Sequence, residues 1–385
     1  MTNMFEKSHY EVLVWFQNEF PDLVQSMRES DHNFDSDNVN VYHAENDVWS
    51  HTMMVFKNSE FFSEGNHHVK WAALLHDLGK PGAREVVEDR KRVRFTGHSG
   101  LSAFMAVDVL NKAGLEAEDA LLVFKLISMH GELFNYITAD GEIKEKVKEV
   151  FAFDRDFLRH LTHLVRADSL GRFHSDGNFS YRKVMKDLPE KMEEFFSDVA
   201  ETVETDVTET EGKLTVLVGP PCSGKSSYLS SLMQEIEDQA ENMSDDTVVI
   251  SRDDLVVAAG LKRNMDYNEA WKFFQRNRKL AQEEVDGVLT KNVQAARLFG
   301  KSVIVDLTNM TKKGRRRWKH EFANYDRKII VFVVGVSDLK QRCDSRFEET
   351  GKFLPEAAVK RMCMNFSLPL KSEDYSDIEY VWAKD

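Results

Sequence analysis

Residues 216–226 contain a glycine-rich segment that could bind phosphate. They read Val-Leu-Val-Gly-Pro-Pro-Cys-Ser-Gly-Lys-Ser, so an apolar strand leads directly into the pattern G-x4-G-K-S. Such glycines let backbone N–H groups curl around phosphate oxygens, and the N-terminus of the following helix adds positive potential. Lys225 would reach the β- and γ-phosphates, and Ser226 would hold Mg²⁺. The segment predicts a nucleoside triphosphate site lined by Gly219, Pro220, Pro221, Cys222, Ser223, Gly224, Lys225, Ser226 and Ser227.

The first half of the chain contains a second set of reactive side chains. Its members are His51, the adjacent pair His76-Asp77, His98, His130 and Asp168. Neutral imidazole and carboxylate groups suit Mn, Fe, Co, Ni, Zn or Mg, and an adjacent His-Asp pair can supply two ligands. Two metals about 3.5–4 Å apart can clamp the attacking and leaving oxygens of phosphoryl transfer. These residues therefore predict a metal centre that acts on phosphorus.

The elements expected to position these histidines are helices. Apolar residues recur every three or four positions over 5–20, 51–61, 69–75, 101–113, 117–129, 154–167 and 181–196. This spacing is typical of amphipathic helices. Strand candidates in this half are few, such as 92–95, so we expect an all-α first domain.

The elements expected around the phosphate loop are strands alternating with helices. Apolar β-branched runs at 214–218, 247–250, 302–305 and 329–334 alternate with helical patterns at 226–239, 268–296 and 311–323. This order predicts an α/β domain with a parallel sheet, and such sheets bind ligands at the carboxyl ends of their strands. The Thr/Glu-rich stretch 197–212 is expected to be a linker, with a short edge strand as the alternative. It would separate domains at 1–196 and 213–385.

Composition limits the cellular setting and the partners. The 385 residues have a net charge of −14, with −16 on residues 1–212 and +2 on residues 213–385. An acidic chain is a poor candidate for nonspecific duplex binding, although a local basic groove in the second half stays compatible. Neither a membrane span nor a signal peptide is expected. Three widely spaced cysteines predict neither a disulfide framework nor a zinc site, and we expect a reducing cytoplasm.

The histidine–aspartate motifs resemble those of the HD-domain metal-dependent phosphohydrolases over roughly residues 40–190. The motifs are Leu-His-Asp-Leu-Gly-Lys around His76 and Arg-Ala-Asp-Ser-Leu-Gly-Arg around Asp168. The resemblance implies one divalent transition metal (Mn, Co, Ni, Fe or Zn) and a second beside it. It implies His51, His76, Asp77 and Asp168 as ligands of the first metal and His98 and His130 as ligands of the second. It also implies that Lys80 contacts the scissile phosphate; Arg166 and Arg172 are further candidates, and His43 and Glu45 are second-shell or substrate-facing residues.

Three features of the second half favour a kinase among P-loop proteins. Asp253 follows the second expected strand, where a carboxylate can take the proton of an acceptor hydroxyl. Asp306 ends another expected strand, where it can organise Mg²⁺ and its water. Arg342, Arg346 and Lys352 follow the last expected strand and form a lid that can neutralise the transferring phosphoryl group.

This set resembles the 5′-hydroxyl polynucleotide kinases of phage and bacterial RNA repair, from residue 213 to about 365. The resemblance implies ATP or another nucleoside triphosphate with Mg²⁺, held by Lys225, Ser226 and Asp306. It implies Asp253 as general base and Arg342 and Arg346 on the donor phosphates. Arg315-Arg316-Arg317-Trp318 is similar to the family's segment after the third strand. One position departs: Val256 stands where the family has an acceptor-binding arginine, so the candidates are Arg252, Arg263, Arg276 or Arg278.

Together the two halves resemble the bifunctional HD–polynucleotide kinase end-healing enzymes. The resemblance implies RNA or DNA ends as substrates, a 5′-hydroxyl to be phosphorylated, and a 2′,3′-cyclic or 3′-phosphate to be removed. A downstream RNA ligase and self-association are compatible with this interpretation, and a membrane is not. One alternative is an HD nucleotidase or dNTP hydrolase fused to a small-molecule nucleoside kinase. Another is a nucleotide sensor with a degraded HD half, which the intact ligand set and Asp253 disfavour.

Overall fold

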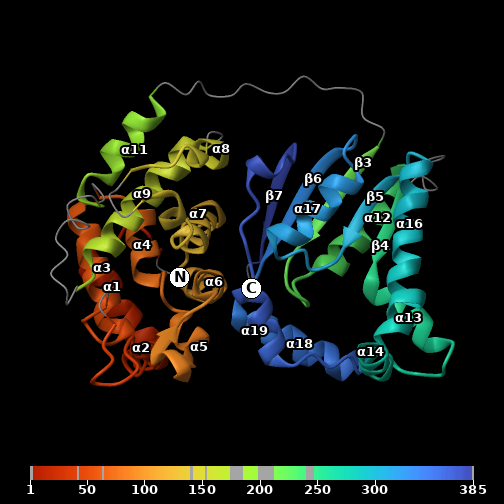
Figure 1. Ribbon diagram of the computed structural model, residues 1–385, viewed down its shortest axis with the longest axis horizontal. Coiled ribbons are helices and arrows are strands. Elements are labelled where there is room, and N and C mark those ends of the chain that lie inside the picture. The colour runs from red at the N-terminus through yellow and green to blue at the C-terminus, as the bar shows by residue number, and fades with distance from the viewer. Residues whose placement is uncertain are drawn as a thin grey trace. The chain divides into compact units, whose positions relative to one another are not determined.

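The computed structural model describes residues 3–40, 43–62, 65–138, 142–151, 154–173, 185–197, 212–239 and 247–383. The chain forms two compact units (Figure 1). The first comprises residues 1–203 with 363–368 and 384–385, and the second comprises residues 204–362 and 369–383. The expected linker lies mostly outside the described residues, since only Ser197 and Gly212 at its two ends are described.

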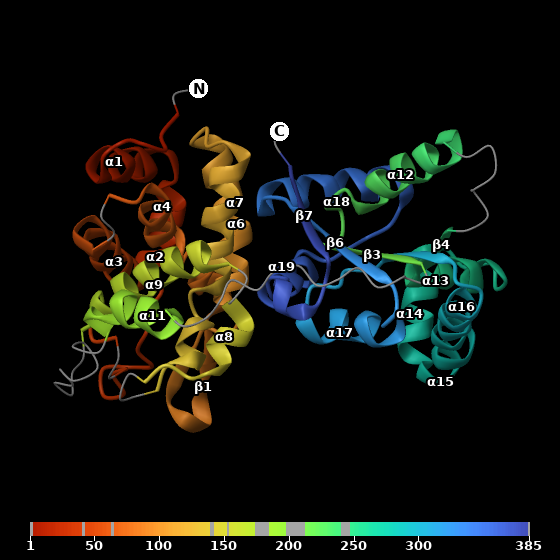
Figure 2. The same cartoon turned by 90° about the horizontal axis from the view of Figure 1, so that it is seen from above.

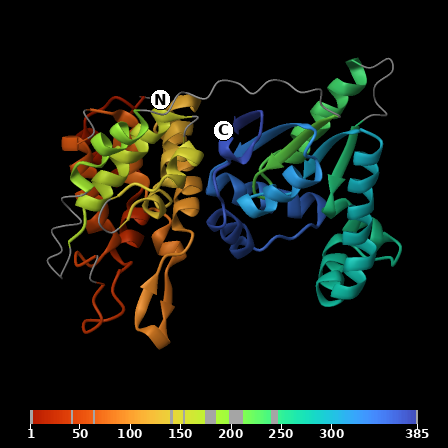
Figure 3. The same cartoon turned by 45° about the horizontal axis from the view of Figure 1, so that its top comes forward.

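The first unit is helical, as predicted. Its helices are α1 (His9–Glu19), α2 (Pro21–Arg28), α3 (Val48–Phe62), α4 (His67–Leu75), α5 (Lys80–Ala83), α6 (His98–Lys112), α7 (Ala117–Met129), α8 (Lys146–Phe151), α9 (Arg155–Leu170) and α11 (Leu188–Phe196). The expected strand at 92–95 is β2 (Arg92–Arg94), which pairs antiparallel with β1 (Glu85–Val87). This hairpin projects from the helices in Figure 3. The expected helix over 181–196 is described only from residue 185, and its first part lies outside the described residues.

Helix α4 lies at the centre of this unit and fixes the position of the His-Asp pair that follows it. Trp71, Leu74 and Leu75 are fully buried, so every face of α4 packs against other helices. Asn66 caps its first turn by accepting a hydrogen bond from the N–H of Val69 at 3.0 Å. A helix buried all round cannot rotate without exposing apolar surface, so the residues at its C-terminus are held firmly.

The second unit is an α/β domain, as predicted. Its sheet has the order β4-β5-β3-β6-β7, and all four pairings are parallel. The strands are β3 (Lys213–Val218), β4 (Thr247–Ser251), β5 (Ser302–Asp306), β6 (Asp326–Val333) and β7 (Asp377–Trp382). The first four confirm the expected strands, and β7 was not expected. Strand β3 lies in the middle, so the phosphate loop that follows it emerges from the centre of the sheet.

Helices cover both faces of this sheet (Figure 2). Helices α12 (Lys225–Gln239) and α18 (Val336–Thr350) lie on one side, and α16 (Gly287–Leu298) and α17 (Lys312–Glu321) lie on the other. The prediction of one helix over 268–296 was wrong. The structure has α14 (Tyr267–Arg276), α15 (Arg278–Ala281), the π-helical turn η4 (Gln282–Asp286) and then α16. Asn277 breaks the helix, since its φ of −107° and ψ of 63° are not helical. Helices α13 (Arg252–Leu261) and α19 (Glu356–Met364) complete the unit.

Candidate functional site

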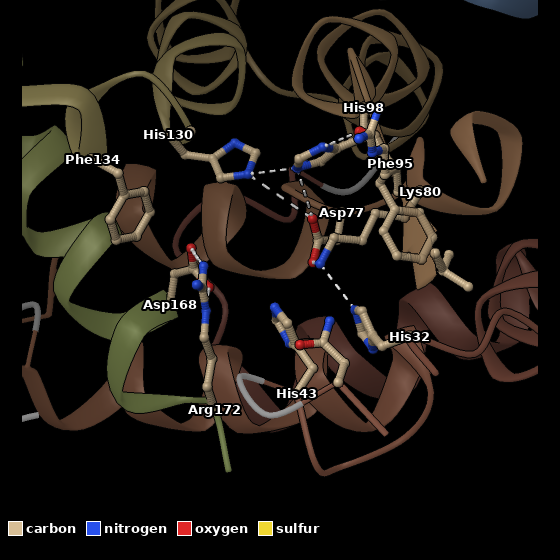
Figure 4. Close-up of a pocket in the computed structure, with 14 residues that line it drawn as sticks. His32, His43, Asp77, Lys80, Phe95, His98, His130, Phe134, Asp168 and Arg172 are labelled. Carbon is tan, nitrogen blue, oxygen red and sulfur yellow. Dashed lines mark hydrogen bonds and ion pairs between the residues drawn. The ribbon is translucent and has the colours of Figure 1, made fainter. Parts of the chain in front are cut away.

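The four histidines predicted as metal ligands lie at the ends of different helices, and Figure 4 labels His98 and His130 among them. His51 lies in the first turn of α3, His76 follows the last residue of α4, His98 begins α6 and His130 follows α7. His51, His76, Asp77, His130 and Asp168 are each at most 3% exposed. Gly79 permits this convergence, because a Cβ there would lie 2.7 Å from the His98 carbonyl oxygen and 2.6 Å from the Ser102 nitrogen. The glycine of the His-Asp motif thus lets α6 approach Asp77.

Backbone carbonyls fix the orientation of three imidazoles. Nδ1 of His76 lies 3.0 Å from the Ala73 oxygen, and Nδ1 of His130 lies 2.7 Å from the Ile127 oxygen. His98 has the same arrangement with Phe95 at 2.8 Å. When Nδ1 donates its proton to a carbonyl, Nε2 is left as a lone-pair ligand, which is the tautomer that metal sites use. The three Nε2 atoms face the interior of the site.

Asp77 is shared between two groups of donors. Its Oδ2 lies 3.1 Å from His76 Nε2 and 3.5 Å from His51 Nε2. Its Oδ1 lies 3.4 Å from His98 Nε2 and 4.0 Å from His130 Nε2. Each group offers three donor atoms within 4.8 Å of one another. The carboxylate can therefore bridge two cations, one on each oxygen.

Two observations test whether these residues fit a metal centre. Neither oxygen of the buried Asp77 accepts a well-directed hydrogen bond from any residue that the structure describes. Buried carboxylates normally accept hydrogen bonds, so the oxygens of Asp77, one of which lies 2.8 Å from the Lys80 ammonium group, are suited to bind a cation. Burial acts to raise the pKa of Asp77, but the charges of His76 and Lys80 hold that pKa well below its usual value. A carboxylate beside imidazole nitrogens is the donor set of a divalent transition metal.

Asp168 joins this centre through His51. Its Oδ1 lies 3.1 Å from His51 Nε2, while Nε and Nη2 of Arg172 donate to its two oxygens at 3.1 and 2.7 Å. His51 Nδ1 lies 3.1 Å from Glu45 Oε1. Burial acts to lower the pKa of His51, but the hydrogen bonds with Asp168 and Glu45 raise it overall. Arg166 is the other arginine suggested by the sequence. Its Nη1 lies 3.8 Å from Oε1 of Glu190.

His32 also belongs to this site and was missed by sequence reasoning. Its Nδ1 lies 3.0 Å from the Asn46 carbonyl oxygen, which leaves Nε2 as the acceptor for Lys80 Nζ at 3.0 Å. Lys80 Nζ also lies 2.8 Å from Asp77 Oδ2. Burial and the Lys80 charge lower the pKa of His32, so the ring is neutral and can accept. No motif marked this histidine, because the contact spans 48 positions of sequence.

A cavity of about 300 Å³ opens onto this centre. The ring of His43 stacks on His32 at 4.2 Å, and its Nδ1 lies 2.7 Å from Glu45 Oε1. Lys80 Nζ lies 5.5 Å from the centre of the Phe95 ring, and Arg172 Cζ lies 5.1 Å from the centre of the Phe134 ring; all four side chains are labelled in Figure 4. Cationic side chains, aromatic side chains and the candidate metal ligands thus surround a space large enough for a phosphorylated nucleoside.

The phosphate loop of the second unit has the backbone shape of an anion site. Cys222 and Gly224 have φ angles of 64° and 97°, so successive N–H groups turn toward one side of the loop. Lys225 Nζ donates to the carbonyl oxygens of Gly219 and Pro220 at 2.8 and 2.7 Å. The Ser223 hydroxyl is buried with no partner among the described residues, and Ser226 is exposed at the start of α12.

Two carboxylates approach this loop from neighbouring strand ends. Burial lowers the pKa of Lys225 to about 8, although Asp306 and Asp253 both act to raise it. Burial also raises the pKa of Asp306. Asp253 lies in the first turn of α13 and accepts a hydrogen bond from the Tyr267 hydroxyl at 3.3 Å. The structure therefore brings together Lys225, Asp253 and Asp306.

Helix α18 brings the predicted lid arginines to the loop. Arg346 Nη1 donates to Cys222 Sγ at 3.8 Å. Arg342 Nη1 lies 3.9 Å from the position that a Cβ on Gly224 would occupy. Lys352 Nζ lies 4.7 Å from the centre of the Tyr267 ring. Two guanidinium groups thus lie beside the phosphate loop, while Lys352 lies against Tyr267.

The structure leaves fewer arginines that could bind the acceptor substrate than the sequence suggests. Val256 is buried in the core between α13 and α14. Arg252 donates to Asp286 at 2.9 Å, and Arg263 donates to Glu284 at 2.6 Å. Arg315 is also occupied, since it is fully buried against Glu373. Arg276 and Arg278 are exposed and stay candidates.

Two protein-family models match this chain. The model of the HD domain matches residues 48–156, and that of an AAA domain matches residues 214–369. The first range includes His51, Asp77 and His130, and the second includes the phosphate loop. The chain therefore joins an HD domain to a P-loop domain. It is a fusion of an HD domain with a kinase-like P-loop domain, as the sequence resemblance predicted.

Individual relatives are similar over part of the chain. Heterogeneous nuclear ribonucleoprotein U-like protein 2 of Homo sapiens is 28% identical over 185 residues, which cover 47% of this chain and 23% of that protein. Its counterpart in Mus musculus is 28% identical over 47% of this chain and 24% of its own length. The chain thus spans about a quarter of these relatives.

Two solved structures are similar to part of this chain. A chain in "Structure of the Pnkp1/Rnl/Hen1 RNA repair complex" is 26% identical with a TM-score of 0.28, over 43% of this chain and 46% of that chain. A chain in "Structure of Pnkp1/Rnl/Hen1 complex" is 25% identical with a TM-score of 0.24, over 36% of this chain and 41% of that chain. TM-scores this low carry no conclusion about fold or function. In the described part of the chain, no helix is long and apolar enough to cross a bilayer.

Proposed function

We propose that this protein heals nucleic-acid ends, most simply RNA ends, at two separate sites. The P-loop unit phosphorylates a 5′-hydroxyl from a nucleoside triphosphate, and the HD unit removes a 2′,3′-cyclic phosphate and the resulting phosphomonoester. The observation that carries the proposal is that one chain brings together two candidate sets of residues for phosphorus chemistry. These are Asp77 between two imidazole groups, and Asp253 with Lys225 at the phosphate loop.

In the kinase reaction, Asp253 accepts the proton of the 5′-hydroxyl as that oxygen attacks the terminal phosphoryl group. Tyr267 orients this carboxylate through its hydrogen bond. Lys225, Arg342 and Arg346 neutralise the charge that spreads over the phosphoryl oxygens in a loose transition state. Ser226 and Asp306 would hold Mg²⁺. Lys225 leaves its carbonyl partners in the loop to reach the phosphates.

In the phosphoesterase reaction, this chain's residues bind and orient the phosphate. His51, His76, Asp77 and Asp168 would hold one divalent metal, and Asp77, His98 and His130 would hold another. When bound, such metals polarise phosphoryl oxygens and lower the pKa of water. Lys80 places a positive charge beside them, and His32 holds its ammonium group in position. Phe95 and Phe134 supply aromatic surface to a cavity that is otherwise lined largely by charged and polar side chains.

The proposal implies particular partners. RNA carrying a 5′-hydroxyl and a 2′,3′-cyclic phosphate is the substrate, and a ligase that joins 3′-hydroxyl and 5′-phosphate ends is the reaction that consumes the products.

The test is end-group analysis of an RNA with a 5′-hydroxyl and a 2′,3′-cyclic phosphate, incubated with ATP, Mg²⁺ and Mn²⁺. The proposal expects a 5′-phosphate and a 3′-hydroxyl. Asp77→Asn is expected to leave the 3′ end unchanged while the 5′ end is phosphorylated. Phosphorylation of free nucleosides with no phosphorylation of the oligonucleotide would replace the proposal by a nucleoside kinase.

A further inference from the structure

Two exposed aromatic side chains lie in contact at the end of helix α18, which carries the predicted lid arginines. Phe347 is 48% exposed, and Phe353, in the turn after the helix, is 58% exposed. Their rings meet edge to face, with centroids 5.6 Å apart and planes at 74°. Single exposed apolar side chains are common, but two phenylalanines in contact form a small aromatic surface that another molecule can cover.

The turn that carries Phe353 is attached to helix α14, which lies next to the end of α18 in Figure 1. Asn268 Oδ1 accepts a hydrogen bond from the Phe353 N–H at 3.0 Å, and Asn268 Nδ2 donates to the Gly351 carbonyl oxygen. Gly351 ends α18 with a φ of 69°, a conformation that favours glycine. The aromatic surface is therefore held on a fixed backbone.

This surface lies beside the proposed acceptor site. Tyr267 precedes Asn268 in α14, and its hydroxyl donates to Asp253 Oδ2 at 3.3 Å. Lys352 precedes Phe353, and its Nζ lies 4.7 Å from the centre of the Tyr267 ring. Two successive contacts thus connect the segment that carries Phe353 to the carboxylate proposed as general base.

The charges near Phe347 favour bases over phosphates as the group that covers it. Glu348 and Glu349 follow Phe347 directly in α18, and carboxylates repel phosphate oxygens. Bases are uncharged, and their π faces stack on aromatic side chains whatever the sequence. A duplex stacks its bases on one another and presents its phosphates outward, so an unpaired strand fits this surface better.

We propose that Phe347 and Phe353 form a stacking surface for unpaired bases of the acceptor strand, next to its 5′-hydroxyl. The surface would make the P-loop unit select single-stranded polynucleotides over free nucleosides. The two side chains are specificity-determining residues, since they contact the bases and not the reacting atoms. This inference rests on the proposed function, in that Asp253 receives a 5′-hydroxyl, and it adds the class of acceptor that the site prefers.

The first experiment compares two acceptors in the full-length protein and in the double variant Phe347→Ala/Phe353→Ala. One acceptor is an unpaired RNA with a 5′-hydroxyl, and the other is a nucleoside 3′-monophosphate. KM for the RNA should rise by about fivefold to a hundredfold, because stacking of one base on an aromatic ring contributes factors of that size. The kcat for the RNA, KM for ATP and KM for the mononucleotide should each change by less than about twofold.

The matched control is Phe299→Ala. Phe299 is 71% exposed and lies between α16 and the start of β5, at the amino end of the strands, whereas the phosphate loop follows the carboxyl end of β3. This variant should behave as the unchanged protein does. A double variant whose KM for the RNA equals that of Phe299→Ala would overturn the inference.

The second experiment detects stacking directly. The fluorescent base 2-aminopurine, which is quenched when it stacks, is placed in turn near the 5′ end of the same RNA. Binding without ATP should quench it at one or more positions, and saturating double variant should not. Phe353→Trp should keep the quenching, since a larger ring also stacks. Equal quenching by the double variant and the unchanged protein would show that the bases stack elsewhere.

The possible failures are distinguishable. An unchanged protein that phosphorylates no oligonucleotide contradicts the proposed function. One that phosphorylates RNA with a KM that is insensitive to both phenylalanines contradicts only the stacking surface. If the double variant instead sediments as a smaller species than the unchanged protein, with KM for RNA unaltered, the surface joins two copies of the chain and the inference is wrong.

Discussion

Individual contacts in the HD site give the first prediction. His32→Ala removes the acceptor that holds Lys80 Nζ. Lys80 Nζ would then keep only its contact with Asp77 Oδ2, and the phosphoesterase kcat should fall by about tenfold to a hundredfold, because misplaced groups cost such factors. Metal content, measured by mass spectrometry, should stay unchanged, which distinguishes a positioning role from a ligand role. His320→Gln in the other unit is the control, and loss of metal in His32→Ala would refute this role.

Asp253, the proposed general base, gives a second prediction. Asp253→Asn should lower 5′-phosphorylation by about a hundredfold or more, since general base catalysis contributes factors of that size. Affinity for nucleotide should change little, because the carboxylate faces the acceptor. Asp254→Asn, the neighbouring residue on α13, is the matched control. A larger loss in Asp254→Asn than in Asp253→Asn would reassign the base.

Lys225 gives a prediction on pH. Burial lowers its pKa to about 8 in the free protein, and a triphosphate requires the charged form. Binding therefore needs proton uptake above about pH 8, and affinity should fall by up to about tenfold per pH unit there while staying flat below. Calorimetry at pH 7 and pH 9 in buffers of different ionisation enthalpy measures this uptake. Equal affinity at both values would contradict it.

The candidate residues were largely predictable because the chemistry is local in sequence. His76-Asp77 and Gly224-Lys225 are adjacent pairs, and the structure places both where their motifs indicate. The contacts of His32 and Cys222 could not be predicted. His32 reaches Lys80 only because the segment before α3 folds over the site, and Cys222 meets Arg346 only when α18 packs against the sheet.

Whole strands and helices could likewise be predicted only where the local sequence pattern is clear. The buried strands β3 and β5 read as continuous apolar runs, so their assignment followed from the sequence. Strand β7 reads Asp-Ile-Glu-Tyr-Val-Trp at the edge of the sheet, where partial exposure permits polar residues and hides the pattern. The break at Asn277 was missed because apolar spacing continues on both sides of it.

Helix α17 gives a prediction about stability. Arg315 is fully buried and donates to Glu373 at 2.9 and 2.7 Å, so the basic run in which it lies is partly structural. Arg315→Met leaves Glu373 as a buried unpaired charge and should destabilise the unit by about 3–5 kcal/mol. Arg316→Met, on the exposed side of the same helix, should change stability by less than about 0.5 kcal/mol. Urea denaturation of both variants checks this; equal effects would show that the burial of Arg315 contributes nothing.

At the scale of the molecule, the two compact units lead to a complementation prediction. Each reaction uses residues of a single unit, so neither should require an intact site in the other. A mixture of Asp77→Asn and Asp253→Asn should therefore convert both ends of the same RNA, although each variant converts only one. Ligation of the product by an added RNA ligase reports the result. Failure of the mixture, with each variant active alone, would indicate that both steps must occur on one polypeptide.

Asp77 differs from the histidines because it belongs to both candidate cation sites, whereas His98 and His130 belong to one of them. Deleting His98 or His130 removes a donor from one neighbourhood and leaves the other intact, so occupancy should drop from two ions per chain to one. Deleting the carboxylate withdraws an oxygen from both neighbourhoods at once. Asp77→Asn should therefore bind close to no metal ions per chain, whereas His130→Asn should bind one. A single side chain would then determine whether the HD unit binds any metal.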